Sequence, residues 1–567
     1  MNPRSSLDAS MRASARESAF RHPQGAVRFL IQAVVLLGAL WLWSPPAGAG
    51  NARDVKLVVL EFHGLKQSII EDNLDVLPHF RELLYGKDGA QSHVSLPRAL
   101  TTLPAASQPA VTSMYTGLFP GRTGVVSSIW LDRESVGVRT LVSYGQQRIN
   151  RILKENGVEN VFERFAKAGR RSMTSMLMVT SGVEWPIRSG AFFWGNSSVT
   201  GRVCNGRWIP HAAYVDRKTM EGFLTGHVTA YKKSLTGVCR RQGVVPDLMV
   251  VQLLGTDLHS HYPLAHPDAF DLTMTGIQRY YAQAVLDPLV GQLVSTLKAL
   301  GWYDRAIVLL VSEQGFSLIR KQAPNRIVDD SLRGVFRLPG FLRSTRDADA
   351  VIMPGAGTKE VYLKNRQTGD WMTPPRLLAD VKPAIDRLLA HPGVRDATEA
   401  ILVSQYPGER SEGIDETDRW WVLDEETYGK GDGSSASFLN SLKPLSALRG
   451  RFELADYLAT GLREQYNRRT LPDIKLVTRQ GVYFEGDYDK VAHHGSFYPD
   501  DCLVSFWIAG PGLSRVLPGR HVIQETVSTL DVVPILLHLA GMPPATGLDG
   551  RNPLADLPPA QEEPIHR

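Results

Sequence analysis

The chain contains 567 residues and carries a formal net charge of +5. This length allows a large hydrophobic core and more than one folding unit. Five arginines against two acidic residues give residues 1–49 a charge of +3, so the rest of the chain is nearly balanced. Because the sequence has no long basic run, its charge pattern does not favour a nucleic acid partner.

Residues 1–49 have the pattern of an export signal. The arginines precede the apolar run FLIQAVVLLGALWLW at residues 29–43, and the small residues SPPAGAG follow it. The run is short for a membrane span, and Ala47 and Ala49 form the A-x-A pattern of a signal peptidase site. We therefore expect cleavage after Ala49, a periplasmic or secreted mature protein and no stable membrane span. An uncleaved membrane anchor is the alternative.

Cysteines are few, and they are Cys204, Cys239 and Cys502. Export would permit a disulfide bond, because disulfides persist in oxidising compartments. Cys204 and Cys239 lie 35 residues apart in one stretch, which makes them the preferred pair. Three unpaired thiols are the alternative.

Apolar runs alternate with amphipathic segments through the first part of the chain. The apolar runs predict buried strands that end in polar residues, and the segments between them predict helices. We therefore expect an α/β fold with a doubly wound, mostly parallel central sheet flanked by helices. In chain order the elements are a strand at 56–64, helices at 77–84, from 108 and from 160, a strand from 246 that runs into a polar loop ending at 261, and a helix, turn and strand over 280–315.

The alternation weakens between residues 346 and 474. Glycine, proline and charged residues become frequent there, with short helical stretches such as LLADVKPAIDRLLAHP (377–392). The earlier pattern returns with the strand-like LVSFWIAGPGL (503–513) and the helical LDVVPILLHLAG (530–541). We therefore expect core segments at 50–345 and 475–567, interrupted by an inserted subdomain at 346–474.

Polar residues stand at the ends of several predicted strands. In open α/β sheets, ligands bind beyond the carboxyl ends of the strands. Asp, Glu and His side chains at that edge suit a zinc-like divalent ion, although each short motif is a weak signal alone and solvated loop residues are the favoured explanation of Asp257 and His261 when that motif is taken by itself. The residues are Glu61, His63, Asp257, His261, Glu313, Gln314, His493 and His494.

Ser107 begins the segment SQPAVTSMYTG. A serine before a helix is most often an N-cap. It is also a candidate nucleophile, because the positive end of a helix favours an anionic group. Together with strand-end metal ligands, Ser107 would suit metal-assisted attack on a small anionic ester.

Longer motifs resemble the alkaline phosphatase superfamily, closest to its type I phosphodiesterase/nucleotide pyrophosphatase branch. The resemblance covers most of residues 55–345 and 475–555. It rests on SQPAVTSMYTGLFPGRTG, AFFWGNSS, DLMVVQLLGTDLHSH, HHGSFYPDDCLVSFWIAGPG and TVSTLDVVPILLHLAGMPPATGLDGR. It implies the same α/β fold and a hydrolase of phosphoric or sulfuric esters.

The resemblance also implies site residues. The family uses two divalent ions, usually zinc, and a Thr, Ser or modified Cys as nucleophile. Its spacing assigns the nucleophile to Ser107, ten residues before the glycine of YTG and two before the proline of SQP. It assigns one metal ion to Asp257, His261 and His494, all of which are present.

The second metal site departs from the family pattern. His63 replaces a strand-end Asp, and SEQG replaces SDHG, so that Glu313 and Gln314 stand where the family has Asp and His. Ser128 takes the place of an Asn that helps to hold a phosphoryl oxygen, and Thr123 that of a His. The altered site either binds an ion with different preferences or has been lost.

The sequence therefore predicts an exported, metal-dependent phosphodiesterase with a serine nucleophile. The alternative is a catalytically degenerate relative that keeps one metal site and acts in binding. A sulfatase is a minor alternative, because Val111 occupies the position where a sulfatase has Arg.

Overall fold

The computed structural model describes most of the chain after the predicted export signal. The signal itself, the AFFWGNSS motif at 191–198 and the side chain of Cys204 lie outside the described residues. The described ranges are 54–141, 145–187, 201–204, 207–210, 212–225, 233–263, 271–339, 345–405, 419–485 and 490–557.

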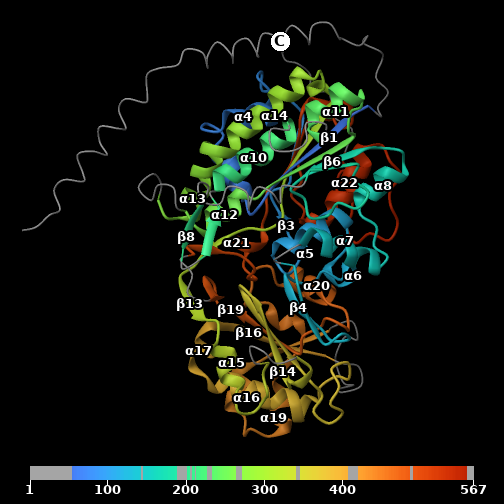
Figure 1. The fold of residues 1–567 in the computed structure, drawn as a ribbon. Coiled ribbons are helices and arrows are strands. Elements are labelled where there is room, and N and C mark those ends of the chain that lie inside the picture. Colours follow the sequence, from blue (N-terminus) through green and yellow to red (C-terminus); the bar gives the residue numbers. More distant parts are fainter. Residues whose placement is uncertain are drawn as a thin grey trace, which may run out of the picture. The chain divides into compact units, whose positions relative to one another are not determined.

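An eight-stranded sheet forms the centre of the described chain (Figure 1). Strand β1 (Lys56–Phe62) pairs in parallel with β10 (Leu248–Leu253) on one side and with β11 (Ala306–Ser312) on the other. Strand β22 (Phe506–Ala509) runs antiparallel to β11. The outer strands are β2 (His93–Ser95), β6 (Ser172–Ser175), β7 (Trp185–Ile187) and β23 (Arg520–Val522), in the order β23-β2-β22-β11-β1-β10-β6-β7. This arrangement confirms the predicted α/β fold with a mostly parallel sheet.

The side chains of β1 alternate between two buried cores, because successive residues of a strand point to opposite faces. Leu57 and Val59 join one core, whereas Val58, Leu60 and Phe62 join the other. Since helices cover both faces, the central strands are apolar along most of their length. The first face is covered by α5 (Ser107–Thr116), α8 (Val161–Lys167) and α22 (Val532–Leu539), and the second by α4 (Pro78–Tyr85), α10 (Ala212–Leu224) and α14 (Asp287–Ala299).

The predicted helix that leads to β11 is interrupted. Helix α13 (Met274–Tyr281) continues through a π-helical turn (Ala282–Leu286) before α14 begins. Pro288 follows this turn and has no N–H for a regular helical bond, and the N–H of Asp287 donates to the carbonyl of Ala282 instead. The chain therefore stays helical up to β11 with one widened turn.

The predicted disulfide bond is not formed. Cys239 is a free thiol in α11 (Leu235–Gln242). Its thiol donates to the carbonyl of Leu235, one helical turn earlier, at 2.7 Å. Cys502 is also free, and it is buried.

A second sheet has six strands and is antiparallel throughout. It has its own buried core, to which α15 (Ile327–Leu332), α16 (Lys382–Ala390) and α19 (Ser435–Ser441) contribute. Most of it falls within the predicted insertion at 346–474, whose boundaries stay a prediction. Its strands are β14 (Ala350–Gly355), β15 (Thr358–Leu363), β16 (Thr398–Ser404), β17 (Trp420–Leu423), β18 (Leu442–Lys443) and β19 (Ile474–Thr478), in the order β14-β15-β19-β16-β17-β18.

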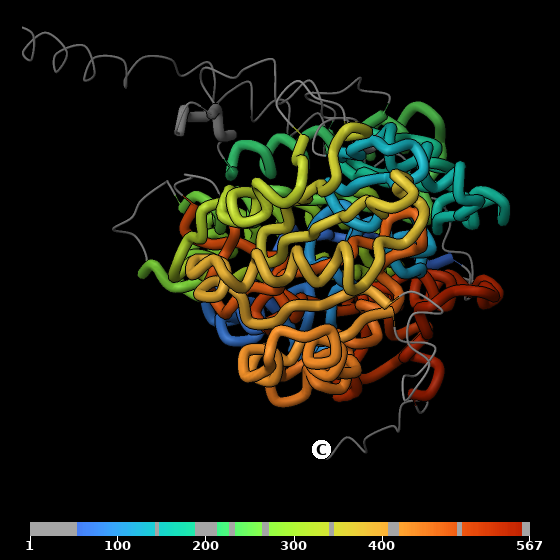
Figure 2. Tube along the Cα trace, turned by 90° about the horizontal axis from the view of Figure 1, so that it is seen from below, coloured from blue at the N-terminus to red at the C-terminus, as the bar shows by residue number. Residues whose placement is uncertain are grey.

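The opposite face of the second sheet packs against the main core. Leu402 of β16 belongs to the same buried cluster as Met114 of α5 and Leu458 of α20 (Ala455–Gln465). In the view from below, the yellow and orange chain of this region lies in front of the rest of the protein (Figure 2). The second sheet therefore contacts the layer that contains α5, the helix that begins at Ser107.

Candidate metal centre

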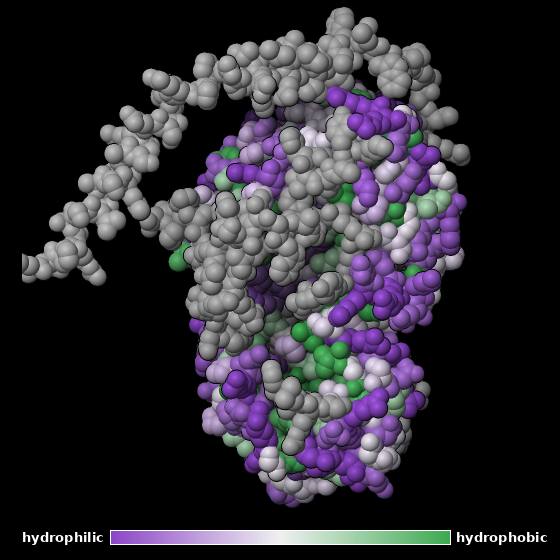
Figure 3. Space-filling model, in the orientation of Figure 1, coloured by the Kyte–Doolittle hydropathy of each residue, from purple (hydrophilic) through white to green (hydrophobic). Residues whose placement is uncertain are grey.

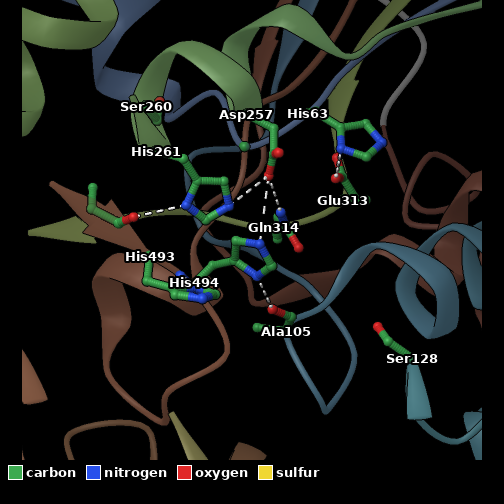
Figure 4. A network of polar contacts seen from close by, with 12 residues as sticks. His63, Ala105, Ser128, Asp257, Ser260, His261, Glu313, Gln314, His493 and His494 are labelled. Carbon is green, nitrogen blue, oxygen red and sulfur yellow. Dashed lines mark hydrogen bonds and ion pairs between the residues drawn. The ribbon is translucent and has the colours of Figure 1, made fainter. Parts of the chain in front are cut away.

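Three predicted ligands meet at the carboxyl edge of the main sheet, and we call Asp257, His261 and His494 the outer cluster. The Nε2 atoms of His261 and His494 each lie 3.5 Å from Oδ1 of Asp257. The Asp257 side chain is 18% exposed and those of the two histidines less. Figure 4 shows both rings beside this one carboxylate. The structure thus brings together the residues that the sequence assigned to the first ion.

Helix α12 (Gly255–His261) accounts for two of these residues. The sequence predicted a polar loop here, but Asp257 and His261 lie four residues apart on a helix and therefore share one of its faces. At the start of α12, the N–H of Gly255 donates to Asp216 at 2.8 Å. A Cβ at Gly255 would lie 1.9 Å from the hydroxyl oxygen of Tyr281. The start of this helix thus requires glycine.

Backbone carbonyls orient both histidine rings of the outer cluster. Nδ1 of His261 lies 2.8 Å from the carbonyl oxygen of Ala492, and Nδ1 of His494 lies 3.0 Å from that of Ala105. A carbonyl only accepts hydrogen bonds, so each Nδ1 carries the ring proton and each Nε2 directs its lone pair towards Asp257. Metal-binding histidines in proteins are commonly held in this way.

Phe316 packs against both rings. Its ring centroid lies 5.0 Å from that of His261 and 5.1 Å from that of His494, edge to face in both cases. Gly64, which follows His63 with a φ of +78°, makes room for this ring, since a Cβ there would lie 2.3 Å from Phe316. The turn after β1 therefore helps to position the outer cluster.

His493 is a further candidate ligand. Donor atoms of His261, His493 and His494 all lie within 4.8 Å of one another. However, Nδ1 of His493 accepts the backbone N–H of His494 at 2.8 Å, and its Nε2 lies 3.1 Å from Nζ of Lys490. Because both ring nitrogens of His493 already have partners, Asp257 fits the third ligand position better.

The electrostatics of the outer cluster suit a cation. Burial alone would raise the pKa of Asp257, but the neighbouring His261 and His494 outweigh it and lower this pKa below its ordinary value. Burial lowers the pKa of His261 well below its ordinary value, against the opposing charge of Asp257. An ionised carboxylate and a neutral imidazole are the forms that bind a divalent ion. The outer cluster therefore fits the metal ion that the family resemblance implies.

Ser107 is the first residue of α5, and its side chain is half-buried. The N-cap position is occupied by Ala106 and has no side-chain cap, which leaves the first-turn N–H groups without a side-chain acceptor. Ala105, two residues before Ser107, accepts the hydrogen bond from His494. The segment that leads into α5 therefore contacts the outer cluster, and its helix N-terminus suits an anion.

Ser128 lies beside Gln108, the residue that follows Ser107. The Ser128 hydroxyl donates to Oε1 of Gln108, and both side chains are half-buried. Ser128 thus holds the carboxamide of Gln108, which neighbours the candidate nucleophile in the chain. A carboxamide is also the group that the family resemblance places here, there from an Asn side chain. Thr123 is buried and donates to the carbonyl of Pro120, so it serves the short helix α6 (Pro120–Thr123).

Glu61, His63 and Glu313 form a second group, which we call the inner cluster. One donor atom of each residue lies within 4.8 Å of those of the other two. Nδ1 of His63 lies 3.1 Å from Oε1 of Glu313 (Figure 4). The side chains of His63 and Glu313 are 5% and 0% exposed, and Glu61 is fully buried. Two residues predicted for the second metal site, His63 and Glu313, therefore do meet.

Two neighbours hold the inner cluster. The hydroxyl of Tyr115 donates to Oε2 of Glu61 at 2.8 Å, and Nε2 of Gln252 donates to Oε1 of Glu61 at 2.8 Å and lies 3.0 Å from Nε2 of His63. Burial raises the pKa of Glu61 to about 7 in spite of these hydrogen bonds. Burial, followed by the charge of Glu61, raises the pKa of Glu313 well above its ordinary value, and burial lowers that of His63 to about 4. This environment favours neutral side chains unless a cation balances the carboxylates.

Gln314 lies between the two clusters. Its Nε2 donates to Oδ1 of Asp257 at 3.2 Å, so its amide group contacts the outer cluster rather than Glu313 or His63. Its Oε1 is buried and has no hydrogen-bond partner among the described residues. The predicted role of Gln314 as a ligand of the second ion stays a prediction, and the hydrogen bond to Asp257 offers it a different role.

Sequence reasoning named Glu61 as a strand-end candidate but assigned it to neither metal ion, and it missed Tyr115, Gln252 and Gln108. Glu61 stands two positions before His63, and the period-two rule for strands could have placed both on one face. The signal for Glu61 was a single carboxylate inside an apolar strand. Tyr115, Gln252 and Gln108 gave no signal, because their roles depend on contacts between distant segments.

The chain resembles known proteins both in sequence and in fold. Residues 57–497 match the sequence profile of the type I phosphodiesterase/nucleotide pyrophosphatase family. Murine ectonucleotide pyrophosphatase/phosphodiesterase 5, solved as an inactive variant in complex with AMP, has a similar fold at 13% sequence identity, with a TM-score of 0.51 over 87% of this chain and 96% of that one. The human protein of the same name matches at 13% identity and a TM-score of 0.50, over 88% of this chain and 97% of that one. No curated protein sequence matches the chain.

The fold, with candidate ligand groups at the carboxyl edge of a mostly parallel sheet, is that of the alkaline phosphatase superfamily. Within that superfamily, the chain belongs to the type I phosphodiesterase/nucleotide pyrophosphatase family, whose profile covers most of its length. The resemblance drawn from the sequence motifs is thereby confirmed.

Proposed function

We propose that this chain is an exported, metal-dependent phosphodiesterase with Ser107 as its nucleophile. The observation that carries the proposal is the outer cluster, in which one carboxylate and two Nε2 atoms converge beside the segment that leads into α5. Membership of a phosphodiesterase family supports the same class of reaction.

Zinc is the ion that we propose for the outer cluster. Two imidazole nitrogens and one carboxylate oxygen are a common donor set for catalytic zinc. The carbonyls of Ala105 and Ala492 hold the rings in the tautomer that this set requires. When bound, the ion supplies Lewis acidity and balances charge on the phosphoryl group.

The proposed reaction has two displacement steps. Oγ of Ser107 forms a bond to phosphorus while the bond from phosphorus to the leaving alcohol breaks, and the hydroxyl proton leaves Ser107 as the alcohol takes one up. The covalent intermediate is a phosphodiester between Ser107 and the remaining alcohol, and attack of water on its phosphorus restores the Ser107 hydroxyl and releases the phosphate monoester. First-turn N–H groups of α5 bind a non-bridging oxygen. Gln108, held by Ser128, offers a further amide group next to Ser107 in the chain.

A nucleoside phosphate ester is the substrate that we propose to test first. The family is defined by phosphodiesterase and nucleotide pyrophosphatase activity, and one structural neighbour was solved with AMP. The second sheet, which contacts the layer that contains α5, is the region that would select the leaving group.

A degenerate binding protein is the second candidate. The observation that favours it is the hydrogen bond from Gln314 to Asp257, because the amide is engaged by the outer cluster and not by His63 or Glu313. In this reading the chain keeps one ion, binds an anionic ester and does not turn it over. Measured turnover decides between the two candidates.

Export forms part of the proposal and is supported by the apolar run at 29–43 and the small residues after it. Among the described residues, no helix is long and apolar enough to cross a membrane. On the face drawn in Figure 3, hydrophilic residues cover most of the described surface. N-terminal sequencing of the exported fraction should give a start at Gly50, whereas a start at Met1 in the membrane fraction would favour an uncleaved anchor.

Substitution of Ser107 tests the covalent mechanism. Ser107→Ala removes the attacking oxygen and should lower turnover of a nucleotide phosphodiester by at least about 10⁴-fold, the scale seen when a nucleophile is deleted. Ser107→Thr keeps a hydroxyl of the type that the family also uses and should retain measurable activity. Metal content should stay unchanged in both variants. Wild-type turnover that survives Ser107→Ala would exclude Ser107 as the nucleophile.

A further inference from the structure

Glu61 occupies an unusual place in β1. It lies on the face of β1 that carries Leu57 and Val59, whose side chains belong to the core beneath α5. Its partners in register on the adjacent strands are Gln252 and Val311. A fully buried glutamate in such an apolar row costs free energy unless it is paired or neutralised. Tyr115 and Gln252 each donate a hydrogen bond to the Glu61 carboxylate, but neither carries a positive charge that would stabilise its ionised form.

The buried oxygens of the inner cluster have few protein partners. The Glu313 carboxylate interacts with the backbone N–H groups of Gly64 and Glu313, and its Oε1 lies 3.1 Å from Nδ1 of His63, but neither of its oxygens accepts a hydrogen bond of regular geometry from the described residues. Oε1 of Gln252 is also buried without a hydrogen-bond partner. Buried polar atoms are normally satisfied, so unsatisfied oxygens on side chains that are 0% exposed indicate a missing positive group.

We propose that Glu61, His63 and Glu313 bind a divalent cation, with Glu61 as a ligand in the place expected for Gln314. Two carboxylates and one imidazole form a more oxygen-rich donor set than the outer cluster, so manganese should compete better with zinc here than there. The inference deepens the proposed function and rests on it in assuming metal chemistry at this edge of the sheet. Its test does not use turnover.

Rigid elements position these three ligands. Glu61 is within β1, His63 directly follows it, and Glu313 directly follows β11, which pairs with β1 in parallel. Tyr115 of α5 fixes the Glu61 carboxylate from the opposite side at 2.8 Å. Ligands that come from paired strands are held more precisely than ligands on loops, which favours a preformed site.

Gln252 offers a way to accommodate the ion. To bind an ion through Nδ1, His63 must carry its ring proton on Nε2 instead. Its Nε2 lies 3.0 Å from Nε2 of the Gln252 amide. Rotation of that amide turns its unpartnered Oε1 towards Nε2–H and makes it the acceptor. Glu61 then exchanges the hydrogen bond from Gln252 for the ion and keeps the one from Tyr115.

The neighbouring Gln314 is held by the outer cluster through its amide nitrogen. Its Nε2 donates to Asp257 at 3.2 Å, which directs the amide N–H towards the outer cluster. Its Oε1 is buried and has no hydrogen-bond partner among the described residues, so it can bind an ion only as a neutral ligand, whereas the Glu61 carboxylate also balances the charge of the ion. Glu61 is therefore the better third ligand for an ion between His63 and Glu313.

Metal stoichiometry tests the proposal. Purified protein is stripped with a chelator, saturated with zinc or manganese, dialysed and measured by elemental analysis. Wild type should hold two ions per chain and Glu61→Gln one. Glu360→Gln, which changes another buried glutamate far along the chain in β15, should keep both ions and controls for the loss of a buried carboxylate.

Each outcome decides the matter. Two ions in the wild type and one in Glu61→Gln support the site, and Glu313→Gln gives the same comparison if Glu61→Gln fails to fold. One ion in the wild type overturns the proposal. Two ions that persist in Glu61→Gln and in Glu313→Gln overturn it as well. Two ions without phosphodiester turnover would contradict the proposed function and support the inner site. Turnover with a single ion would support the proposed function and overturn the inner site.

Discussion

The outer and inner clusters lie at the same edge of one sheet but differ in their access to solvent. The outer cluster is built from a short helix and a loop, and its Asp257 side chain is 18% exposed. The inner cluster is built from the ends of paired strands, and its Glu313 side chain is 0% exposed. An ion bound at the outer cluster would therefore be open to solvent, whereas an ion bound at the inner cluster would be enclosed by protein.

The two clusters also differ in how burial acts on their carboxylates. In the outer cluster the pKa of Asp257 is lowered, since His261 and His494 outweigh burial. In the inner cluster the pKa of Glu61 is raised to about 7 and that of Glu313 well above its ordinary value, because burial dominates. The comparison teaches that an ionised carboxylate is available to a cation at the outer cluster, whereas the inner cluster must lose protons to bind one.

Removal of an outer ligand should have the largest effect. His261→Ala deletes one of the two Nε2 donors, and the loss of the outer ion should lower phosphodiester turnover by roughly 1000-fold or more, since the bound ion is worth several kcal/mol of charge stabilisation. Elemental analysis should then find the inner ion alone.

His259→Ala is the matched control for this change. His259 lies on the same helix but stacks on Tyr281, with ring centroids 4.9 Å apart. This variant should keep the outer ion. Unchanged metal content in His261→Ala would remove that residue from the set of ligands.

The second largest effect should be on the pH dependence of stability, to which the two clusters contribute with opposite sign. A folded-state pKa of about 7 for Glu61, against 4.5 as the ordinary value, adds stability that is complete below pH 4.5 and is lost as pH rises through 7. In metal-free protein this loss should amount to roughly 3 kcal/mol at most. Asp257 acts with the opposite sign, since its lowered pKa adds stability at neutral pH that is lost on acidification.

Urea unfolding in the presence of a chelator, from pH 4.5 to 8, measures this difference. Glu61→Gln should flatten the decline relative to the wild type. Asp216, whose pKa burial also raises to about 7, contributes the same slope to both proteins and cancels in the comparison. Identical slopes in the two proteins would show that Glu61 does not titrate as expected.

Substitution of Gln314 should have the smallest effect. Gln314→Ala removes one hydrogen bond to Asp257 and should weaken the outer ion about tenfold, as the loss of a group that orients a ligand usually does. The inner ion should bind as in the wild type. Competitive titration with a chromophoric chelator measures both affinities, and loss of the inner ion would instead make Gln314 its ligand, as the sequence predicted.

The sequence predicted the outer cluster well because its signals are local. Asp257 and His261 belong to one motif, and His494 belongs to another that the family spacing identifies. The helix start at Ser107 was also visible, although Ser107 turned out to be the first helical residue rather than the cap. The polar loop expected to end at 261 is a helix, because the tertiary hydrogen bond from Gly255 to Asp216 holds the start of α12 and outweighs a weak local preference.

The inner cluster was only half predicted. The sequence assigned His63, Glu313 and Gln314 to one site, and it named Glu61 as a strand-end candidate without assigning it to that site. The direction in which an amide such as Gln314 donates is set by its neighbours, and Asp257 is 57 residues away in the chain. The expected Cys204–Cys239 pair likewise depended on a spatial approach that spacing in the sequence does not specify.

By itself, the sequence determined the alternation of strands and helices, the place of the candidate nucleophile and the three residues that form the outer cluster. These features follow from hydrophobic period and from short motifs, both of which are written in neighbouring residues. The tertiary structure decided which carboxylates share a site. Parallel pairing of β1 with β10 and β11 brings Glu61, Gln252 and Glu313 to one edge, and packing of α5 adds Tyr115. Such convergence depends on strand register and helix packing between distant segments, which no local pattern contains.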